Sequence, residues 1–127
     1  MRGNSGEEKV TVVVGASPKP ERYSNKAVRS LRAHGHRVIP VHPVHSAIEG
    51  LNTVARLDQI QVPIDTVTLY VSPDTGEKLV DDLVRLAPRR VIMNPGAESE
   101  KLELALSAAG IEVERACTLV LLSTGAY

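Results

Sequence analysis

The sequence predicts an α/β fold in which helices cover both faces of a doubly wound, mainly parallel sheet of five to six strands. The first observation is a series of short β-branched runs that are apolar at consecutive positions, as in strands buried on both faces. The second is that segments with a helical apolar stripe separate several of these runs. The third is composition: 43% of the 127 residues are hydrophobic and 24% are charged, as in one soluble globular domain.

The strands follow a polar start. Residues 1–8 contain two glycines and polar side chains and are expected to form a flexible tail, with one domain over residues 9–127. A final run at residues 119–122 fits either a sixth strand or a short helix, because periodicity alone does not decide between them. The five expected strands cover residues 10–14, 38–41, 67–71, 91–93 and, more weakly, 111–113.

Three segments carry apolar residues at helical spacing and are predicted to be helices: residues 24–34, 72–87 and 99–109. Gly35 and Gly110 follow the first and the third, at the position where many helices end. The second begins with Ser72 as a capping hydroxyl and Pro73 at the first helical position, and its apolar ladder includes Val84.

The resulting order is strand, helix, strand, irregular crossover, strand, helix, strand, helix, strand. Right-handed crossovers turn this order into a Rossmann-like sheet. The irregular crossover covers residues 42–62, with a weak signal for a short strand or hairpin at 48–54 and for one helical turn at 55–59.

Charge and composition exclude several classes of partner. Fifteen basic residues balance fifteen acidic ones, and three tyrosines are the only aromatic residues among Phe, Trp and Tyr, so neither a basic surface nor a stacking platform for nucleic acid is expected. No apolar run approaches the roughly 20 residues that span a bilayer, and the start lacks a signal-peptide pattern. We therefore expect a cytoplasmic protein that binds neither nucleic acid nor membrane; the sequence identifies no protein partner.

A ligand is expected at the carboxyl ends of the strands, where open parallel sheets bind their ligands. After the first strand, Gly15, Ala16 and Ser17 allow a sharp turn before a helix whose free N–H groups favour a phosphate. The loop lacks both the G-x-G-x-x-G pattern and a Walker sequence, and the second strand is followed by His42 and Pro43 rather than by an acid for a ribose hydroxyl. An NAD-type nucleotide is therefore disfavoured.

Two segments resemble a known family. The sequences VVGASPKPER at residues 13–22 and GHRVIPVHP at residues 35–43 resemble the small stand-alone CoA-binding domain proteins, which are similar to the CoA-binding domain of the succinyl-CoA synthetase α subunit. NPGAE at residues 94–98 and ERAC at residues 114–117 add to the resemblance, which covers roughly residues 10–117.

The resemblance implies binding of coenzyme A or an acyl-CoA across the strand ends. His42 departs from the Asn that many relatives carry before the Pro, but it retains a hydrogen-bond donor. The synthetase needs a phosphohistidine loop from a second domain that this sequence does not contain, so ligase activity is not expected. By position, Gly15, Ala16 and Ser17 would line the phosphates with Asn25 and Lys26 at the helix start, Val41, His42 and Pro43 would border the adenosine, Val71, Ser72 and Pro73 would pack on the adenine, and Asn94 and Gly96 would face the pantetheine.

We expect binding without catalysis, and alternatives remain open. A small acyl-CoA-dependent transferase or thioesterase would use His42 or Cys117, although no pattern pairs a nucleophile with a base. A second alternative is an NAD-type binding protein. Cys117 is either a buried inert thiol or, near the CoA sulfur, a partner for a mixed disulfide under oxidation. The four histidines within residues 34–45 are expected to be solvated or to face phosphate rather than to bind a metal.

Overall fold

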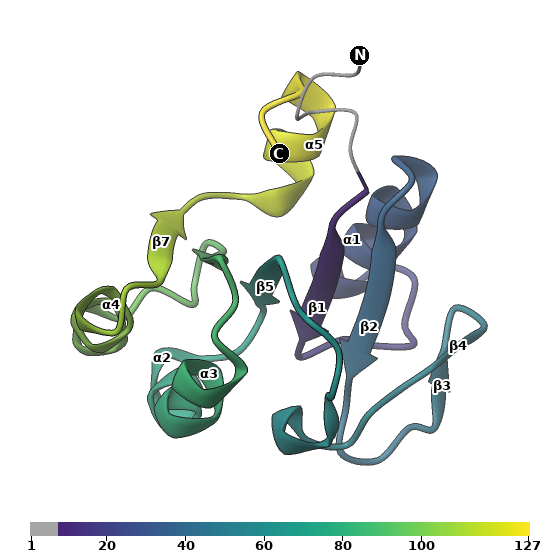
Figure 1. Cartoon of the computed structure of the whole chain (residues 1–127). Coiled ribbons are helices and arrows are strands. Elements are labelled where there is room, and N and C mark those ends of the chain that lie inside the picture. Colours follow the sequence, from purple (N-terminus) through teal and green to yellow (C-terminus); the bar gives the residue numbers. More distant parts are fainter. Residues whose placement is uncertain (1–7) are drawn as a thin grey trace.

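The structure, a computed structural model that describes residues 8–127, contains a five-stranded parallel sheet (Figure 1). Its strands lie in the order β2-β1-β5-β6-β7, so the winding reverses between β1 and β5. This order is that of a doubly wound α/β fold, which confirms the predicted fold class. Of the expected tail, residues 1–7 lie outside the described part of the chain and Glu8 is exposed. The strands are β1 (Val10–Val14), β2 (Arg37–Val41), β5 (Thr66–Leu69), β6 (Arg90–Met93) and β7 (Glu112–Arg115).

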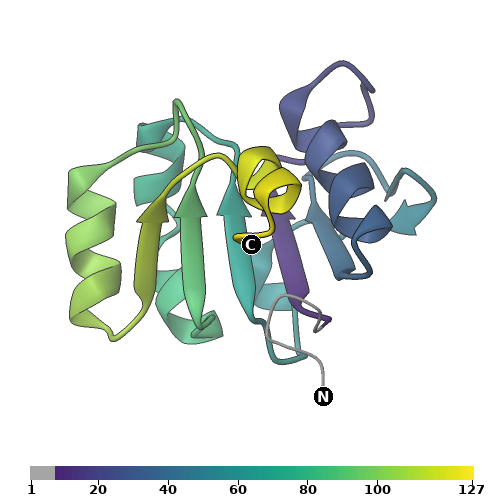
Figure 2. The same cartoon turned by 90° about the horizontal axis from the view of Figure 1, so that it is seen from above.

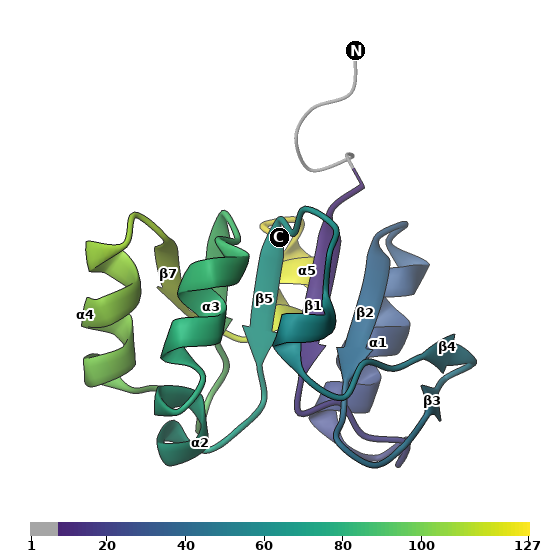
Figure 3. The same ribbon diagram turned by 60° about the horizontal axis from the view of Figure 1, so that its bottom comes forward.

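Helices cover both faces of the sheet. Figure 2 shows α5 crossing over β5 and β1 on the face that also carries α1, and Figure 3 shows α3 and α4 in front of the opposite face. Within residues 8–127 no helix is long and apolar enough to cross a bilayer. The helices are α1 (Tyr23–Ala33), the 3-10 helix η2 (Leu57–Gln59), α2 (Pro73–Glu77), α3 (Val80–Leu86), α4 (Glu100–Ala108) and α5 (Thr118–Thr124).

The two faces of the sheet bury different kinds of side chain. The face under η2, α3 and α4 is aliphatic, with Leu83 and Leu106 packed on the valines and leucines of the strands. The face under α1 and α5 has an aliphatic core around Leu31 and Leu122, but it also buries polar groups. Helix α5 is therefore held to the sheet by hydrogen bonds as well as by apolar contacts. The buried polar residues on this face and at its carboxyl edge include Thr11, Thr66, Thr68, Arg90, Asn94 and Thr118.

The helix predicted over residues 72–87 is interrupted, so this prediction is wrong in its continuity. The chain forms α2 and α3 instead, because Gly76 weakens the helix and allows α2 to pack closely on α4. A Cβ at Gly76 would lie 3.3 Å from a methyl carbon of Leu102. After the break, Leu83 is fully buried, whereas Val84 is 40% exposed and not part of the core.

The crossover between β2 and β5 contains the expected hairpin and helical turn. Strands β3 (Ala47–Ile48) and β4 (Leu51–Asn52) pair antiparallel around Glu49 and Gly50, whose φ angles are 52° and 76°. Two consecutive positive φ angles are typical of a type I′ turn. The 119–122 run, for which strand and helix both remained open, is part of α5 and forms no sixth strand.

Candidate functional site

The loop after β1 lies where the winding of the sheet reverses. Gly15 has a φ of 83°, and a Cβ added to it would lie 2.5 Å from the backbone oxygen of Tyr70, the residue after β5. The Tyr70 N–H donates to the Val14 carbonyl at 2.9 Å. Glycine is therefore required for the two loops to meet, and the meeting point is the crevice in which doubly wound sheets bind ligands.

The start of α1 faces this loop and has neither a side-chain cap, at its N-cap residue Arg22, nor an acidic residue in its own first turn. The backbone N–H groups of a first turn carry partial positive charge, and Lys19 and Lys26 are exposed nearby in sequence. The arrangement suits an anionic ligand, as the sequence predicts.

The Asn25 side chain forms its hydrogen bonds within the protein. It is fully buried, its amide nitrogen donates to the Ser17 carbonyl at 2.9 Å and to the Glu49 carboxylate at 3.0 Å, and its oxygen accepts from Arg29 at 2.8 Å. Both amide hydrogens are therefore taken. Asn25 holds the loop against α1, and a direct contact with the ligand stays a prediction.

Sequence analysis missed Glu49. This residue lies at the tip of the β3–β4 hairpin, and the Arg32 guanidinium donates to its carbonyl at 2.9 Å. Its carboxylate is thereby brought to Asn25 and the start of α1. The Glu49-Gly50 pair is a local turn signal, but only the folding of the hairpin onto α1 creates the contact.

The end of β2 supplies a neutral hydrogen-bond donor. The Nδ1 atom of His42 accepts from the N–H groups of Val44 and His45 at 3.0 and 3.1 Å, which leaves Nε2 to carry the proton. Burial and the neighbouring His45 ring lower the pKa of His42, so the ring is neutral near pH 7. Of the two residues beside it, Val41 is buried and Pro43 is exposed.

The loop after β5 begins a short helix and lines a small hollow. Ser72 accepts from the Thr75 N–H at 3.3 Å, and Pro73 starts α2. Val71 lines a hollow of about 190 Å³ together with Tyr70, Pro95, Gly96 and Ala97. The hollow thus brings together the loops that follow β5 and β6.

Asn94, like Asn25, is a buried side chain with internal partners. It donates to the Thr68 hydroxyl at 2.6 Å and to the Leu69 carbonyl at 2.9 Å, and it accepts from the Thr118 N–H at 2.9 Å. Asn94 therefore joins β5, β6 and α5. Gly96, two residues later, has a φ of 96° and is exposed.

A second cavity, of about 280 Å³, opens beside Asn94. It lies at the strand ends, between the starts of α1 and α5. Only Asn94 among its lining residues was predicted as a ligand contact, although Pro95 follows it directly and Tyr70 precedes the predicted Val71. The lining residues are Tyr23, Tyr70, Asn94, Pro95, Cys117 and Leu119.

His42 and Cys117 are not neighbours. Cys117 precedes Thr118, which is bonded to Asn94 at the end of β6, whereas His42 follows β2. Strand β6 is three strand spacings from β2, about 14 Å. In the described residues Cys117 has no hydrogen-bonded base, so the geometry supports no His42–Cys117 pair.

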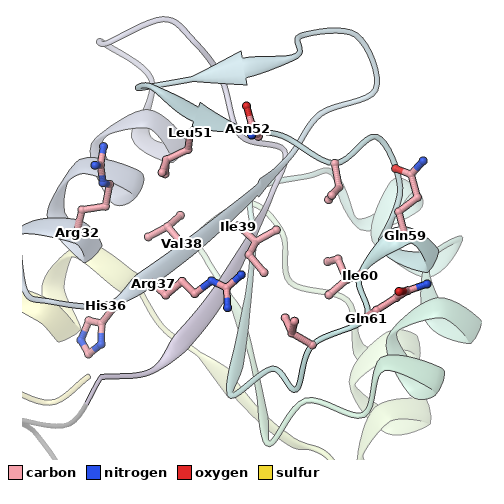
Figure 4. Close-up of a pocket in the computed structure, with 12 residues that line it drawn as sticks. Arg32, His36, Arg37, Val38, Ile39, Leu51, Asn52, Gln59, Ile60 and Gln61 are labelled. Atoms are coloured by element: carbon pink, nitrogen blue, oxygen red, sulfur yellow. The ribbon is translucent and has the colours of Figure 1, made fainter.

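A larger hollow, of about 440 Å³, lies away from the strand ends. It follows the outer edge of β2, between the hairpin and the segment after η2, and Figure 4 shows the Arg37 guanidinium along its floor beside Ile39. It is open and mixed in character, with Leu51 and Ile60 on opposite sides. Nothing in the sequence analysis pointed to it.

His36, which borders this hollow, corrects one expectation. The ring is 8% exposed rather than solvated, its Nδ1 accepts the Lys9 N–H at 3.0 Å, and it lies 5.0 Å from the Tyr127 ring. Burial, then the charge of Lys9, lowers the pKa of His36. His34 and His45 are exposed, as expected.

Comparison with known proteins identifies the family. The sequence model of a family described as "CoA binding domain" matches residues 9–123. The protein belongs to the CoA-binding domain family. Membership confirms the resemblance read from the motifs and supports CoA binding in general.

Solved structures share the fold of this family member. A structure described only as an uncharacterized protein is 40% identical with a TM-score of 0.90, covering 95% of this chain and 99% of that one. The cell-free ID.343 protein of Thermus thermophilus is 29% identical with a TM-score of 0.86, covering 97% and 93%.

Another relative matches this chain over a shorter segment. The uncharacterized protein YneT of Bacillus subtilis (strain 168) is 34% identical over 58 residues, which are 46% of this chain and 43% of YneT. The match therefore spans less than half of that relative's length.

Proposed function

We propose that this protein is a non-catalytic module that binds coenzyme A or an acyl-CoA across the carboxyl ends of its strands. The observation that carries the proposal is the close approach of Gly15 to the Tyr70 carbonyl, which leaves no room for a side chain. The turn therefore exposes backbone atoms at the point where the winding of the sheet reverses. The uncapped start of α1 follows that turn. Together they suit a pyrophosphate.

The remaining parts of the ligand follow from strand order. With the pyrophosphate at Ser17 and Lys26, the adenosine extends toward His42 and the pantetheine toward Gly96. The ends of β2 and β6 are about 14 Å apart, so the ligand lies extended over several strand ends. The loop at 71–73 follows β5, between the ends of β1 and β6, so in this binding mode it lies beside the pantetheine rather than the adenine.

The absence of catalysis is proposed from the separation of the two reactive side chains. In the part of the chain that the structure describes, neither His42 nor Cys117 is bonded to a carboxylate or to a second catalytic group. The alternative, an acyl-CoA-dependent transferase or thioesterase, is favoured by one observation: Cys117 is among the residues that line the 280 Å³ cavity.

Isothermal titration of the purified chain with CoA, dephospho-CoA, NAD and ATP tests the ligand class. CoA should bind most tightly, and at 100 times its dissociation constant it should stabilise the fold by about 2.7 kcal/mol. Binding of NAD or ATP in preference to CoA would overturn the proposal. Hydrolysis or transfer of the acyl group in an assay with butyryl-CoA, abolished by Cys117→Ala, would replace it with the enzyme alternative.

A further inference from the structure

The 280 Å³ cavity beside Asn94 differs from the rest of the strand-end surface in having almost no free polar group. Both amide hydrogens of Asn94 and its amide oxygen form hydrogen bonds within the protein. The Tyr70 hydroxyl is wholly buried, with no hydrogen-bond partner within residues 8–127, so Tyr70 presents its ring to the cavity. Burial raises the pKa of Tyr70 to about 12, and the ring is therefore uncharged.

The other walls are also uncharged. They come from Tyr23, Pro95, Cys117 and Leu119, and within residues 8–127 no lysine, arginine or acidic residue lines the cavity. Neither Arg22, which precedes Tyr23, nor Lys26 lines the cavity; the Lys26 ammonium lies 5.1 Å from the centre of the Tyr23 ring. A group that enters must therefore be apolar, because a charged group would lose its hydration without finding a partner.

The cavity adjoins the hollow at Gly96. The two spaces share Tyr70 and Pro95, so they lie on either side of this pair of residues. In the proposed binding mode the pantetheine runs past Gly96, and its thiol end is then directed toward the shared walls. What continues beyond the sulfur of an acyl-CoA is the acyl chain.

Size limits the occupant. A volume of 280 Å³ is below the roughly 300 Å³ at which pockets for drug-sized ligands begin, and it holds about nine water molecules at liquid density. It excludes the nucleotide half of CoA and any long fatty chain. An acyl group of about four to six carbons, with its thioester, fits.

We propose that this cavity receives a short, uncharged acyl chain, so that the protein binds short-chain acyl thioesters of CoA in preference to free CoA. The inference rests on the proposed function, because the acyl chain is placed by a pantetheine bound at Gly96. It adds the class of ligand, which membership of the family leaves open.

The test is a titration series with CoA and its acetyl, butyryl and succinyl thioesters, with a reductant present. Each buried methylene should strengthen binding about fourfold, so butyryl-CoA should bind at least tenfold more tightly than acetyl-CoA. Succinyl-CoA, of similar length but charged, should bind at least tenfold more weakly than butyryl-CoA. Failure of CoA and of every thioester to bind would refute the proposed function, whereas equal affinity for CoA, acetyl-CoA and butyryl-CoA would refute only the acyl cavity.

Three variants of α5 localise the effect. Leu119→Phe fills the cavity and should reduce the ratio of butyryl-CoA to CoA affinity to about one. Val120→Phe adds a comparable ring at a neighbouring position that is 55% exposed and does not line the cavity, so it should keep the wild-type ratio. Leu119→Ala enlarges the same space and should shift the preference toward hexanoyl-CoA; an unchanged chain-length preference in both Leu119 variants would overturn the inference.

Discussion

Two buried asparagines stabilise the loops at the carboxyl ends of the strands, Asn25 beside the loop after β1 and Asn94 after β6, and their hydrogen-bond partners differ in kind. At the β1 end, Asn25 bonds one backbone carbonyl, that of Ser17, and two charged side chains. At the β6 end, Asn94 bonds the backbone of β5 and α5 and a buried threonine, with no charged partner among residues 8–127. The first asparagine shapes a ligand loop, whereas the second joins elements of the core.

The difference teaches that a polar residue at the end of a strand can serve the fold, the ligand loop, or both. Both asparagines were predicted as ligand contacts, and their side chains are bonded within the protein. A buried donor left without its partner costs about 1–3 kcal/mol, so the two sites should differ mainly in how many buried groups depend on them.

The largest effect is expected from Asn94→Ala. The substitution leaves the Leu69 carbonyl and the Thr118 N–H without their partner, and we expect a loss of about 3–5 kcal/mol in the free energy of unfolding. Urea denaturation measures it. The matched control is Asn52→Ala, at an exposed position of β4, which should change stability by less than about 0.5 kcal/mol. Similar losses in the two variants would contradict the role given to Asn94.

A second pair of variants compares the two glycine loops. Gly15→Ala combines a positive φ with a Cβ 2.5 Å from the Tyr70 oxygen, so about 3 kcal/mol of stability and at least tenfold of CoA affinity should be lost. Gly96→Ala has the positive φ but no atom within 4 Å of the added Cβ, and it should cost only about 1–2 kcal/mol. Urea denaturation of both variants checks this, and equal losses of stability would show that the close approach at Gly15 is unimportant.

Variants of Asn25 and Glu49 distinguish the hydrogen bond that holds the Ser17 loop from the negative charge of the neighbouring carboxylate. Asn25→Ala should cost about 1–2 kcal/mol and weaken CoA binding about tenfold, because the Ser17 loop loses its bond to α1. Glu49→Gln keeps an acceptor for Asn25 but removes a negative charge near the expected phosphates, so CoA affinity should stay equal or rise about twofold. Titration calorimetry decides between these outcomes, and a tenfold loss in Glu49→Gln would assign the carboxylate a direct role in ligand binding.

The smallest effect is on pH dependence, and it concerns only the β2 side of the molecule. His36 and His42 flank β2, and burial lowers the pKa of both below the usual 6.5. The unfolded chain then binds more protons than the folded one, so the stability present above pH 6.5 is lost as the pH falls toward the folded pKa values. Urea midpoints at pH 7.5 and 5.0 should therefore differ. The difference should shrink in His36→Gln, and a fold equally stable at both pH values would contradict the burial assigned to His36.

Local chemistry predicted most of the elements. The β-branched runs, the capping Ser72, the glycines after two helices and the hairpin signal at residues 48–54 each act over a few residues. The division of residues 72–87 was missed because it depends on how closely α2 packs against Leu102, a contact made by a distant segment.

For the candidate site, the sequence alone determined which loops meet, because parallel strands bring their carboxyl ends to one edge, and it pointed to Gly15 and to the family through residues that lie next to each other in the chain. Only the tertiary structure decided that the side chains of Asn25 and Asn94 form hydrogen bonds within the protein and that Glu49 reaches α1. It also decided that Tyr23, Pro95 and Leu119 enclose an apolar cavity. Local preferences are set by neighbours along the chain, whereas cavities and buried hydrogen bonds are set by the strand order and packing that bring distant segments together.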